Sequence, residues 1–113
     1  MRSLSAEREA RLARNEALFR EVNERIADLA HGFGRDEAYE FLCECADLAC
    51  TERVALTAAE YEHVRSDGTT FVLAPGHANP EIEKVVARQD DDHVVVEKVG
   101  VAGAVAAELD PRD

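Results

Sequence analysis

Apolar side chains recur at intervals of three and four residues through the first third of the chain. With one polar position included, they form a heptad pattern over about three repeats: Leu12, Asn15, Phe19, Val22, Ile26, Leu29 and Phe33. This spacing predicts one long amphipathic helix over about residues 5–30. His31-Gly32 is the expected end, because glycine adopts the left-handed helix cap at little cost.

The predicted helix has two interpretations. A polar residue at one core position, here Asn15, fixes the register of a coiled coil, which favours docking on a second copy or on a partner helix. Alternatively, the helix lies on its own domain and Asn15 lies beyond the contact. Three pairs of opposite charge have the favourable i,i+4 order: Glu7–Arg11, Glu16–Arg20 and Glu21–Arg25.

From about residue 36 onwards, the pattern changes to short strands and short helices. Alternating side chains over 39–45 predict a strand that runs into the cysteines, and 53–56 predicts a second strand. Thr57 and Glu60 form a capping box for a helix to about residue 66, with Leu56 and Tyr61 placed as its hydrophobic staple.

The last third of the chain predicts more strands and a closing helix. A strand over 71–74 ends at the turn Pro75-Gly76. Residues 82–88 and 93–99 resemble a hairpin around Asp90-Asp91-Asp92, although Asn79-Pro80-Glu81 is also a fair helix start. Residues 103–109 predict a short helix. The fold class is therefore α+β: a coiled-coil-like helix (1–34), then a small, mostly antiparallel sheet with short helices (35–113).

All three cysteines lie within eight residues: Cys43, Cys45 and Cys50. The odd number and the absence of an export signal argue against a disulfide framework. Soft thiolates close together suit Zn²⁺, which takes four ligands in a tetrahedron. Buried small hydrophobic cysteines are the alternative, but that does not explain Cys45 and Cys50 beside Glu44 and Asp47.

His77 is the expected fourth ligand, because the rigid Pro75-Gly76 turn would present it beside the cysteine loop. The other candidates are His31, His63, His93 and the oxygen of Asp47. We expect one structural zinc ion that ties the cysteine loop to this turn, since metal binding then adds to folding stability.

Two other chemistries fit three thiols and a histidine, an iron–sulfur cluster and a reactive thiol. The order Cys-x-Cys, Cys, His resembles the CDGSH type of [2Fe–2S] domain, but Thr51-Glu52-Arg53-Val54 stands where Asp-Gly-Ser-His would follow. A reactive thiol paired with His77 needs electropositive surroundings, and this segment is acidic. Glu44 would act as a base only beside a metal with an open position. A hard cation at Asp90–Asp92 is less favoured than a charged turn.

Charge and composition narrow the class of function. The 113 residues carry a net charge of −11, and 46% are hydrophobic, which indicates one globular domain. Residues 1–37 hold seven Arg and eight acidic residues, whereas 38–113 hold six basic and sixteen acidic residues. Such a body repels phosphate backbones, so direct nucleic-acid binding is disfavoured. No membrane span or signal peptide is expected, and we expect a cytoplasmic protein.

Much of the chain from Asn15 onward resembles a family of small, uncharacterised acidic proteins of high-GC, actinobacterial-type bacteria. The matching segments are residues 15–26, Phe41-Leu42-Cys43-Glu44-Cys45, Cys50, 57–65, 71–77 and 94–98. The family's Cys-Glu-Cys, Cys and Pro-Gly-His elements correspond to Cys43, Cys45, Cys50 and His77. The resemblance implies a bacterial cytosolic setting and no known activity.

The expected function is a zinc-binding interaction module, for example an adaptor or a regulator of transcription or signalling, and not an enzyme. Its predicted contact residues on the helix are Leu12, Asn15, Phe19, Val22, Ile26 and Leu29, and the acidic body is its second surface. The alternatives are a thiol-based redox sensor that releases zinc and a metal-dependent hydrolase with an open zinc site.

Overall fold

Residues 4–34, 37–89 and 93–112 are described by a computed structural model of the chain. The fold is α+β, as predicted. In chain order its elements are α1 (Leu4–Phe33), β1 (Ala38–Leu42), β2 (Arg53–Thr57), α2 (Ala58–Val64), β3 (Thr70–Leu73), β4 (Glu83–Gln89), β5 (His93–Lys98) and α3 (Gly100–Glu108).

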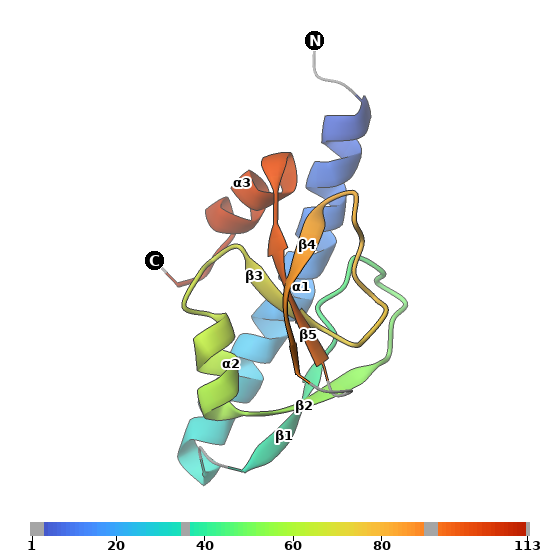
Figure 1. Ribbon diagram of the computed structural model, residues 1–113. Helices are drawn as coiled ribbons and strands as arrows, with labels where there is room; N and C mark the ends of the chain where they lie inside the picture. The colour runs from blue at the N-terminus through green and yellow to red at the C-terminus, as the bar shows by residue number, and fades with distance from the viewer. Residues whose placement is uncertain (1–3, 35–36, 90–92, 113) are drawn as a thin grey trace.

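Helix α1 runs along the whole length of the molecule (Figure 1) and packs against α3, β1 and α2. Small and polar side chains line its buried face: Ala10, Ala13, Glu16, Ala17, Arg20, Asn23, Ala27 and Ala30. Their three- and four-residue spacing is helical, but the face is offset from the apolar stripe read from the sequence. Alanines let the helix approach the body closely, which explains why this face carries so few large apolar residues.

The predicted heptad stripe is divided by the structure. Leu12, Asn15, Phe19 and Ile26 are half-buried against the body, whereas Val22, Leu29 and Phe33 are 45%, 64% and 76% exposed. The helix therefore lies on its own domain. Asn15 nevertheless takes part in that contact, because its side-chain amide donates to the carbonyl of Ala46 at 3.1 Å.

The end of α1 differs from the prediction. The helix continues past Gly32 to Phe33, and Gly34 holds the positive φ angle of 142°. The Gly34 N–H donates to the carbonyl of Ala30 at 3.0 Å. The residue that ends the helix with a positive φ angle is therefore Gly34, and not Gly32 as predicted.

The strands form two antiparallel sheets, one pairing β1 with β2 and the other in the order β3-β5-β4. The predicted hairpin of 82–88 and 93–99 is confirmed as β4 and β5, while its turn Asp90–Asp92 lies outside the described residues. Strand β1 ends at Leu42, before the cysteines, and not at Cys45 as expected. Beyond Leu42 the chain still pairs, because Glu44 N–H donates to the carbonyl of Val72 at 2.9 Å.

Helix α2 begins at the predicted capping box. The Glu60 N–H donates to Thr57 Oγ1 at 3.0 Å, and the Thr57 N–H donates to Glu60 Oε1 at 2.8 Å. Tyr61, on the buried face of α2, stacks on Phe41 of β1 with ring centroids 4.7 Å apart. The cap thus fixes the helix that covers the end of the β1–β2 hairpin.

A cluster of charged side chains is buried between α1 and the three-stranded sheet. Glu16 and Arg20, predicted as an i,i+4 pair, are both fully buried and have other partners. Lys98 of β5 donates to Glu16 and to Glu83, and Arg20 donates to main-chain carbonyls at 2.7 and 2.9 Å. Both cations lie over the ring of Phe71, at 4.5 and 4.7 Å from its centroid. Tertiary contacts therefore replace the expected i,i+4 pair.

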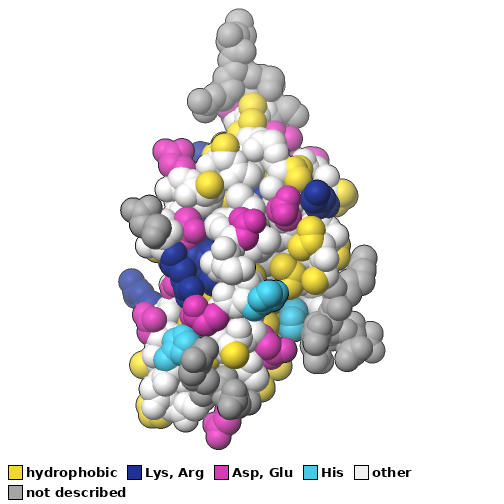
Figure 2. All heavy atoms as spheres, turned by 60° about the vertical axis from the view of Figure 1, so that its left-hand side comes forward, with side chains coloured by type: hydrophobic (Ala, Val, Ile, Leu, Met, Phe, Trp, Pro, Cys, Tyr) yellow, Lys and Arg dark blue, Asp and Glu magenta, His cyan; other side chains and the backbone are white. Residues whose placement is uncertain are grey.

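A network of ion pairs joins the C-terminal end of the chain to α1 and α2. Arg112 pairs with Glu24 and Glu62, while Arg65 pairs with Glu24 and Asp110. In Figure 2 the left-hand side of Figure 1 has been turned toward the viewer, and acidic and basic side chains are interspersed on this face. Within the described ranges, no helix combines the length and apolar character that a membrane crossing requires.

Candidate metal centre

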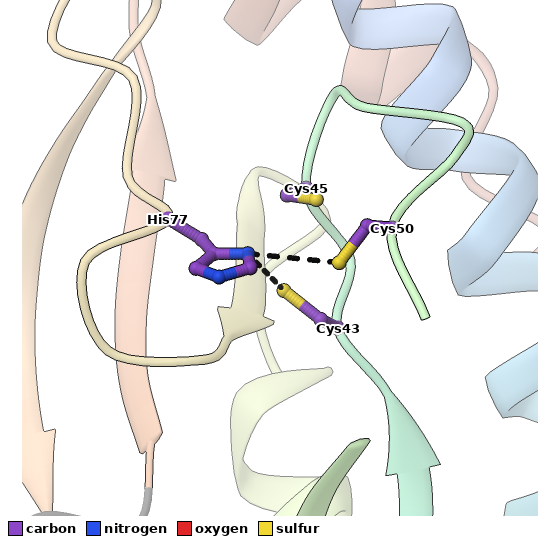
Figure 3. A group of neighbouring side chains, drawn as sticks. All are labelled: Cys43, Cys45, Cys50 and His77. Carbon is purple, nitrogen blue, oxygen red and sulfur yellow. Dashed lines mark hydrogen bonds between the residues drawn. The ribbon is translucent and has the colours of Figure 1, made fainter. Parts of the chain in front are cut away.

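Four side chains from two segments of the chain meet at one point: Cys43, Cys45, Cys50 and His77 (Figure 3). Their three sulfurs and one imidazole nitrogen all lie within 4.8 Å of one another. His77 Nδ1 is 3.5 Å from Cys43 Sγ and 3.6 Å from Cys50 Sγ. This group is able to hold a metal ion, and it bridges the end of β1 to the turn after β3.

Cys43 is held most firmly of the three cysteines. Its N–H donates to the carbonyl of Glu52 at 3.2 Å, which extends the β1–β2 pairing by one residue. Its sulfur accepts a hydrogen bond from the N–H of Ala74, just after β3, at 3.1 Å. Such a main-chain donor stabilises a thiolate, so this sulfur is oriented before any metal arrives.

Cys45 and Cys50 lie at the two ends of a short exposed loop. Asp47 shapes this loop, because its carboxylate accepts from the Ala49 N–H at 2.9 Å and its carbonyl accepts from the Cys50 N–H at 3.0 Å. The Asp47 carboxylate is therefore occupied by the turn and is not part of the cluster. The turn brings Cys50 back toward Cys45, which explains how six residues supply two ligands.

His77 is presented by the turn that the sequence indicated. Gly76 has a φ of 84°, which a side chain would disfavour, and the His77 N–H donates to the carbonyl of Ala74 at 3.1 Å. Ala74 thus anchors both the turn and Cys43. The turn after β3 and the end of β1 are positioned together, so His77 faces the cysteines.

The other histidines are placed elsewhere. His31 contacts Glu62 at 3.0 Å, His63 is exposed on α2, and His93 is buried at the start of β5. Of the four histidines in the chain, His77 alone belongs to the candidate metal-binding group found among the described residues.

Burial shapes the chemistry of the thiols. It raises the pKa of Cys43 and the pKa of Cys45 above the ordinary range for cysteine. A reactive thiol needs the opposite shift, toward an accessible thiolate at neutral pH. A bound cation reverses this balance, because a coordinating thiol is deprotonated outright. The donor set therefore fits a metal better than a free nucleophile.

Glu44 belongs to a buried network that the sequence did not reveal. Its carboxylate accepts from Asn23 Nδ2 at 2.8 Å, from Tyr61 OH at 2.7 Å and from the Val72 N–H at 3.0 Å. It faces away from the sulfurs, since successive side chains of an extended segment point to opposite sides. Glu44 thus joins α1, α2 and β3 behind the cysteines, and this corrects its assignment as a candidate base.

Asn23 completes that network from α1. Besides its bond to Glu44, it accepts from the Leu42 N–H at 2.8 Å and donates to the Leu42 carbonyl at 2.9 Å. The side-chain amide therefore satisfies both peptide groups at the free edge of β1. No signal in the sequence pointed to this role, because a polar residue beside the apolar stripe of a predicted helix is expected to face solvent.

Comparison with known protein families, with curated proteins and with solved structures finds no match to this chain. The resemblance to small acidic bacterial proteins stays a prediction, and the site rests on its own geometry.

Proposed function

We propose that Cys43, Cys45, Cys50 and His77 bind one Zn²⁺ ion and that this ion has a structural role. The observation that carries the proposal is the convergence of three sulfurs and one imidazole nitrogen within 4.8 Å. Three thiolates and one histidine form a common structural zinc set, and sulfur ligands select zinc over hard cations.

A structural role is favoured over a catalytic one by the number of protein donors. Catalytic zinc keeps a position for water and has three protein ligands, whereas structural zinc has four. Cys43 and Cys45 are only 2% and 3% exposed, so solvent has little access to half of the donor set. The ion would tie the β1 end to the turn after β3, and its binding energy would stabilise the fold.

The test is metal content on the chain purified without chelator. About one zinc per chain, with no visible colour, is expected for a structural site of this donor set. Removal of the zinc by a chelator should lower the unfolding temperature, and added Zn²⁺ should restore it. Bound iron with visible absorption would replace the zinc proposal by an iron–sulfur cluster. A purified chain that binds neither zinc nor iron would overturn both the zinc proposal and the iron–sulfur alternative.

The exposed face of α1 supports a second proposal, a protein-interaction function. Leu18, Val22, Leu29 and Phe33 are between 45% and 76% exposed and follow one another at spacings of four, seven and four residues. They therefore lie along one side of the helix, which we name the outer stripe. Contiguous exposed apolar side chains on a helix are typical of interaction surfaces.

A second copy of the chain is the occupant that the charges favour. Along the stripe, exposed Arg25 lies between exposed Glu21 and Asp28. In a two-fold dimer whose helices run antiparallel about the centre of the stripe, Arg25 of each copy lies opposite this acidic pair of the other, within about one helical turn along the axis.

Self-association through the outer stripe is tested by light scattering after size exclusion at several protein concentrations and salt concentrations. The native chain should form dimers that salt weakens, and Leu29→Glu should remain monomeric. Val86→Glu is the matched control, because Val86 is 47% exposed on β4, outside the outer stripe. A native chain that stays monomeric at high concentration would overturn this proposal and leave the zinc proposal unaffected.

A further inference from the structure

The donors of the metal centre differ in how well solvent reaches them. Cys43 is buried and its sulfur is held by the Ala74 N–H, whereas Cys50 is half-buried at the end of an exposed loop. Asp47, Leu48 and Ala49, which precede Cys50, are all exposed. One sulfur of the site is thus open to a small reagent while another is protected.

A surface pocket of about 370 Å³ opens beside the same loop. Its lining includes Cys45, Asp47 and His77 from the centre, together with Leu12 and Asn79. A hydroperoxide is far smaller than this pocket, so it can reach the edge of the cluster formed by Cys45, which is 3% exposed. Neither Cys43 nor Cys50 lines the pocket, and Cys50 is reached from the exposed loop that precedes it.

From this asymmetry we infer that the proposed zinc site is a redox-controlled latch in which Cys45 and Cys50 form a disulfide under hydroperoxide. The inference rests on the proposed zinc function and adds regulation to it. Cys43 remains reduced throughout, because it is protected and belongs to the strand end and not to the loop.

The chemistry balances with a hydroperoxide as the named oxidant. The Cys50 thiolate attacks the peroxide O–O bond, forms a sulfenic acid and releases the alcohol, or water in the case of hydrogen peroxide. The Cys45 thiolate then displaces hydroxide from the Cys50 sulfur and forms the S–S bond. The two thiolates lose two electrons to the O–O bond, and solvent supplies the two protons that convert the released alkoxide and the displaced hydroxide into alcohol and water. The zinc site loses two of its four protein ligands.

Loss of the ion would weaken the contact between the cysteine loop and α1. The cysteine loop is tied to α1 by the hydrogen bond from Asn15 to the Ala46 carbonyl, next to Cys45, and Leu12 of α1 lines the adjacent pocket. A loop rearranged by the Cys45–Cys50 bond can no longer hold these partners in place. Oxidation should therefore weaken the attachment of α1 at residues 12–15, while the Glu44 network with Asn23 stays intact.

The experiment is titration of the zinc-loaded chain with hydrogen peroxide, with a colorimetric indicator for released zinc and mass spectrometry of alkylated thiols. We expect zinc release to parallel the loss of two thiols, a mass decrease of two hydrogens, and alkylation at Cys43 alone. Dithiothreitol with added Zn²⁺ should reverse all three changes. Hydrogen–deuterium exchange should increase at residues 12–15 and remain low around Asn23.

Several outcomes would overturn the latch. One is retention of zinc under peroxide that oxidises exposed thiols of a reference peptide; another is a disulfide that includes Cys43. Cys50→Ser should abolish the peroxide-dependent disulfide, and Leu48→Ser, an exposed loop change beside the ligands, is the matched control that should retain it. A chain that never binds zinc overturns the proposed function as well, whereas zinc bound but insensitive to peroxide overturns the latch alone.

Discussion

The phenolic hydroxyl of Tyr61 donates a 2.7 Å hydrogen bond to the carboxylate of Glu44, the residue between the first two cysteines. Both side chains are fully buried. Burial raises the pKa of Glu44, and the donors Asn23, Val72 and Tyr61 oppose that rise. The candidate metal site therefore lies against a buried polar network, whose hydrogen bonds orient the segment after β1 that carries Cys43 and Cys45.

Tyr61→Phe tests how strongly this network supports the fold. Removal of the hydroxyl leaves a buried carboxylate with one donor fewer, and hydrogen bonds to charged groups contribute about 1.5–3 kcal/mol. We expect a loss of that size in the free energy of unfolding, measured by urea denaturation at fixed zinc concentration. Tyr39→Phe is the control, because Tyr39 OH donates at 2.9 Å to a neutral carbonyl, that of Gly34, at a half-buried site. Equal losses in the two variants would contradict the special role of Glu44.

A pH-dependent stability follows from the buried pair of Glu16 and Lys98. Burial raises the pKa of Glu16 from 4.5 to about 7, although Lys98 and Arg20 oppose the rise. Burial also lowers the pKa of Lys98, so loss of hydration outweighs attraction for both partners. The folded state binds the Glu16 proton more tightly than the unfolded chain. This contribution to stability is therefore complete below pH 4.5 and is lost as the pH rises toward about 7.

Glu16→Gln isolates this contribution. The difference in unfolding free energy between the native chain and the variant should change by about 3 kcal/mol across that window, at about 1.4 kcal/mol per pKa unit. Protonation of the thiols also destabilises a zinc site at low pH, but it acts on both proteins and cancels in the difference. A difference that is flat with pH would show that Glu16 does not titrate in this range.

The sequence predicted the elements well where local rules decide them. The Thr57–Glu60 capping box, the β4–β5 hairpin and the Pro75-Gly76 turn depend on neighbouring residues, so the pattern was sufficient. The buried face of α1 depends instead on distant partners. Glu16 and Arg20 have the spacing of a surface pair, and only the position of Lys98 and Phe71 makes them core residues. Among the site residues, the clustering of cysteines was visible in the sequence, whereas the partners of Glu44 come from three separate elements.

Gly103 is a position where a helix-stabilising substitution should destabilise the protein. Alanine is favoured over glycine within a helix by about 1 kcal/mol. A Cβ at Gly103, however, would lie 2.9 Å from the Lys98 carbonyl oxygen and 3.3 Å from its carbon. Lys98 cannot retreat easily, because its own N–H donates to the Thr69 carbonyl at 2.8 Å. We expect Gly103→Ala to lower the unfolding free energy by about 1–3 kcal/mol, as overpacking does elsewhere.

Gly32→Ala provides the contrast in the same fold. Gly32 lies within α1, and a Cβ there would meet nothing within 4 Å. It should raise the unfolding free energy by up to about 1 kcal/mol in the same urea assay. If both glycine variants stabilise the protein, the close approach of α3 to the end of β5 is incorrect.

A comparison of His77→Ala with another histidine variant tests whether the His77 imidazole is a zinc ligand. His77→Ala leaves three sulfur ligands. Changes in residues that only support the ligands already cost about 10–100-fold in metal affinity. Loss of a ligand should therefore weaken zinc binding by at least about 100-fold. His63→Ala is the matched control, because His63 is exposed on α2 and lies outside the cluster. Competition with a chelator of known affinity measures both variants. Added Zn²⁺ should raise the unfolding temperature of His63→Ala as in the native chain, and that of His77→Ala only at much higher zinc. Equal zinc affinity in the two variants would mean that three sulfurs suffice and that His77 is only a neighbour of the ion.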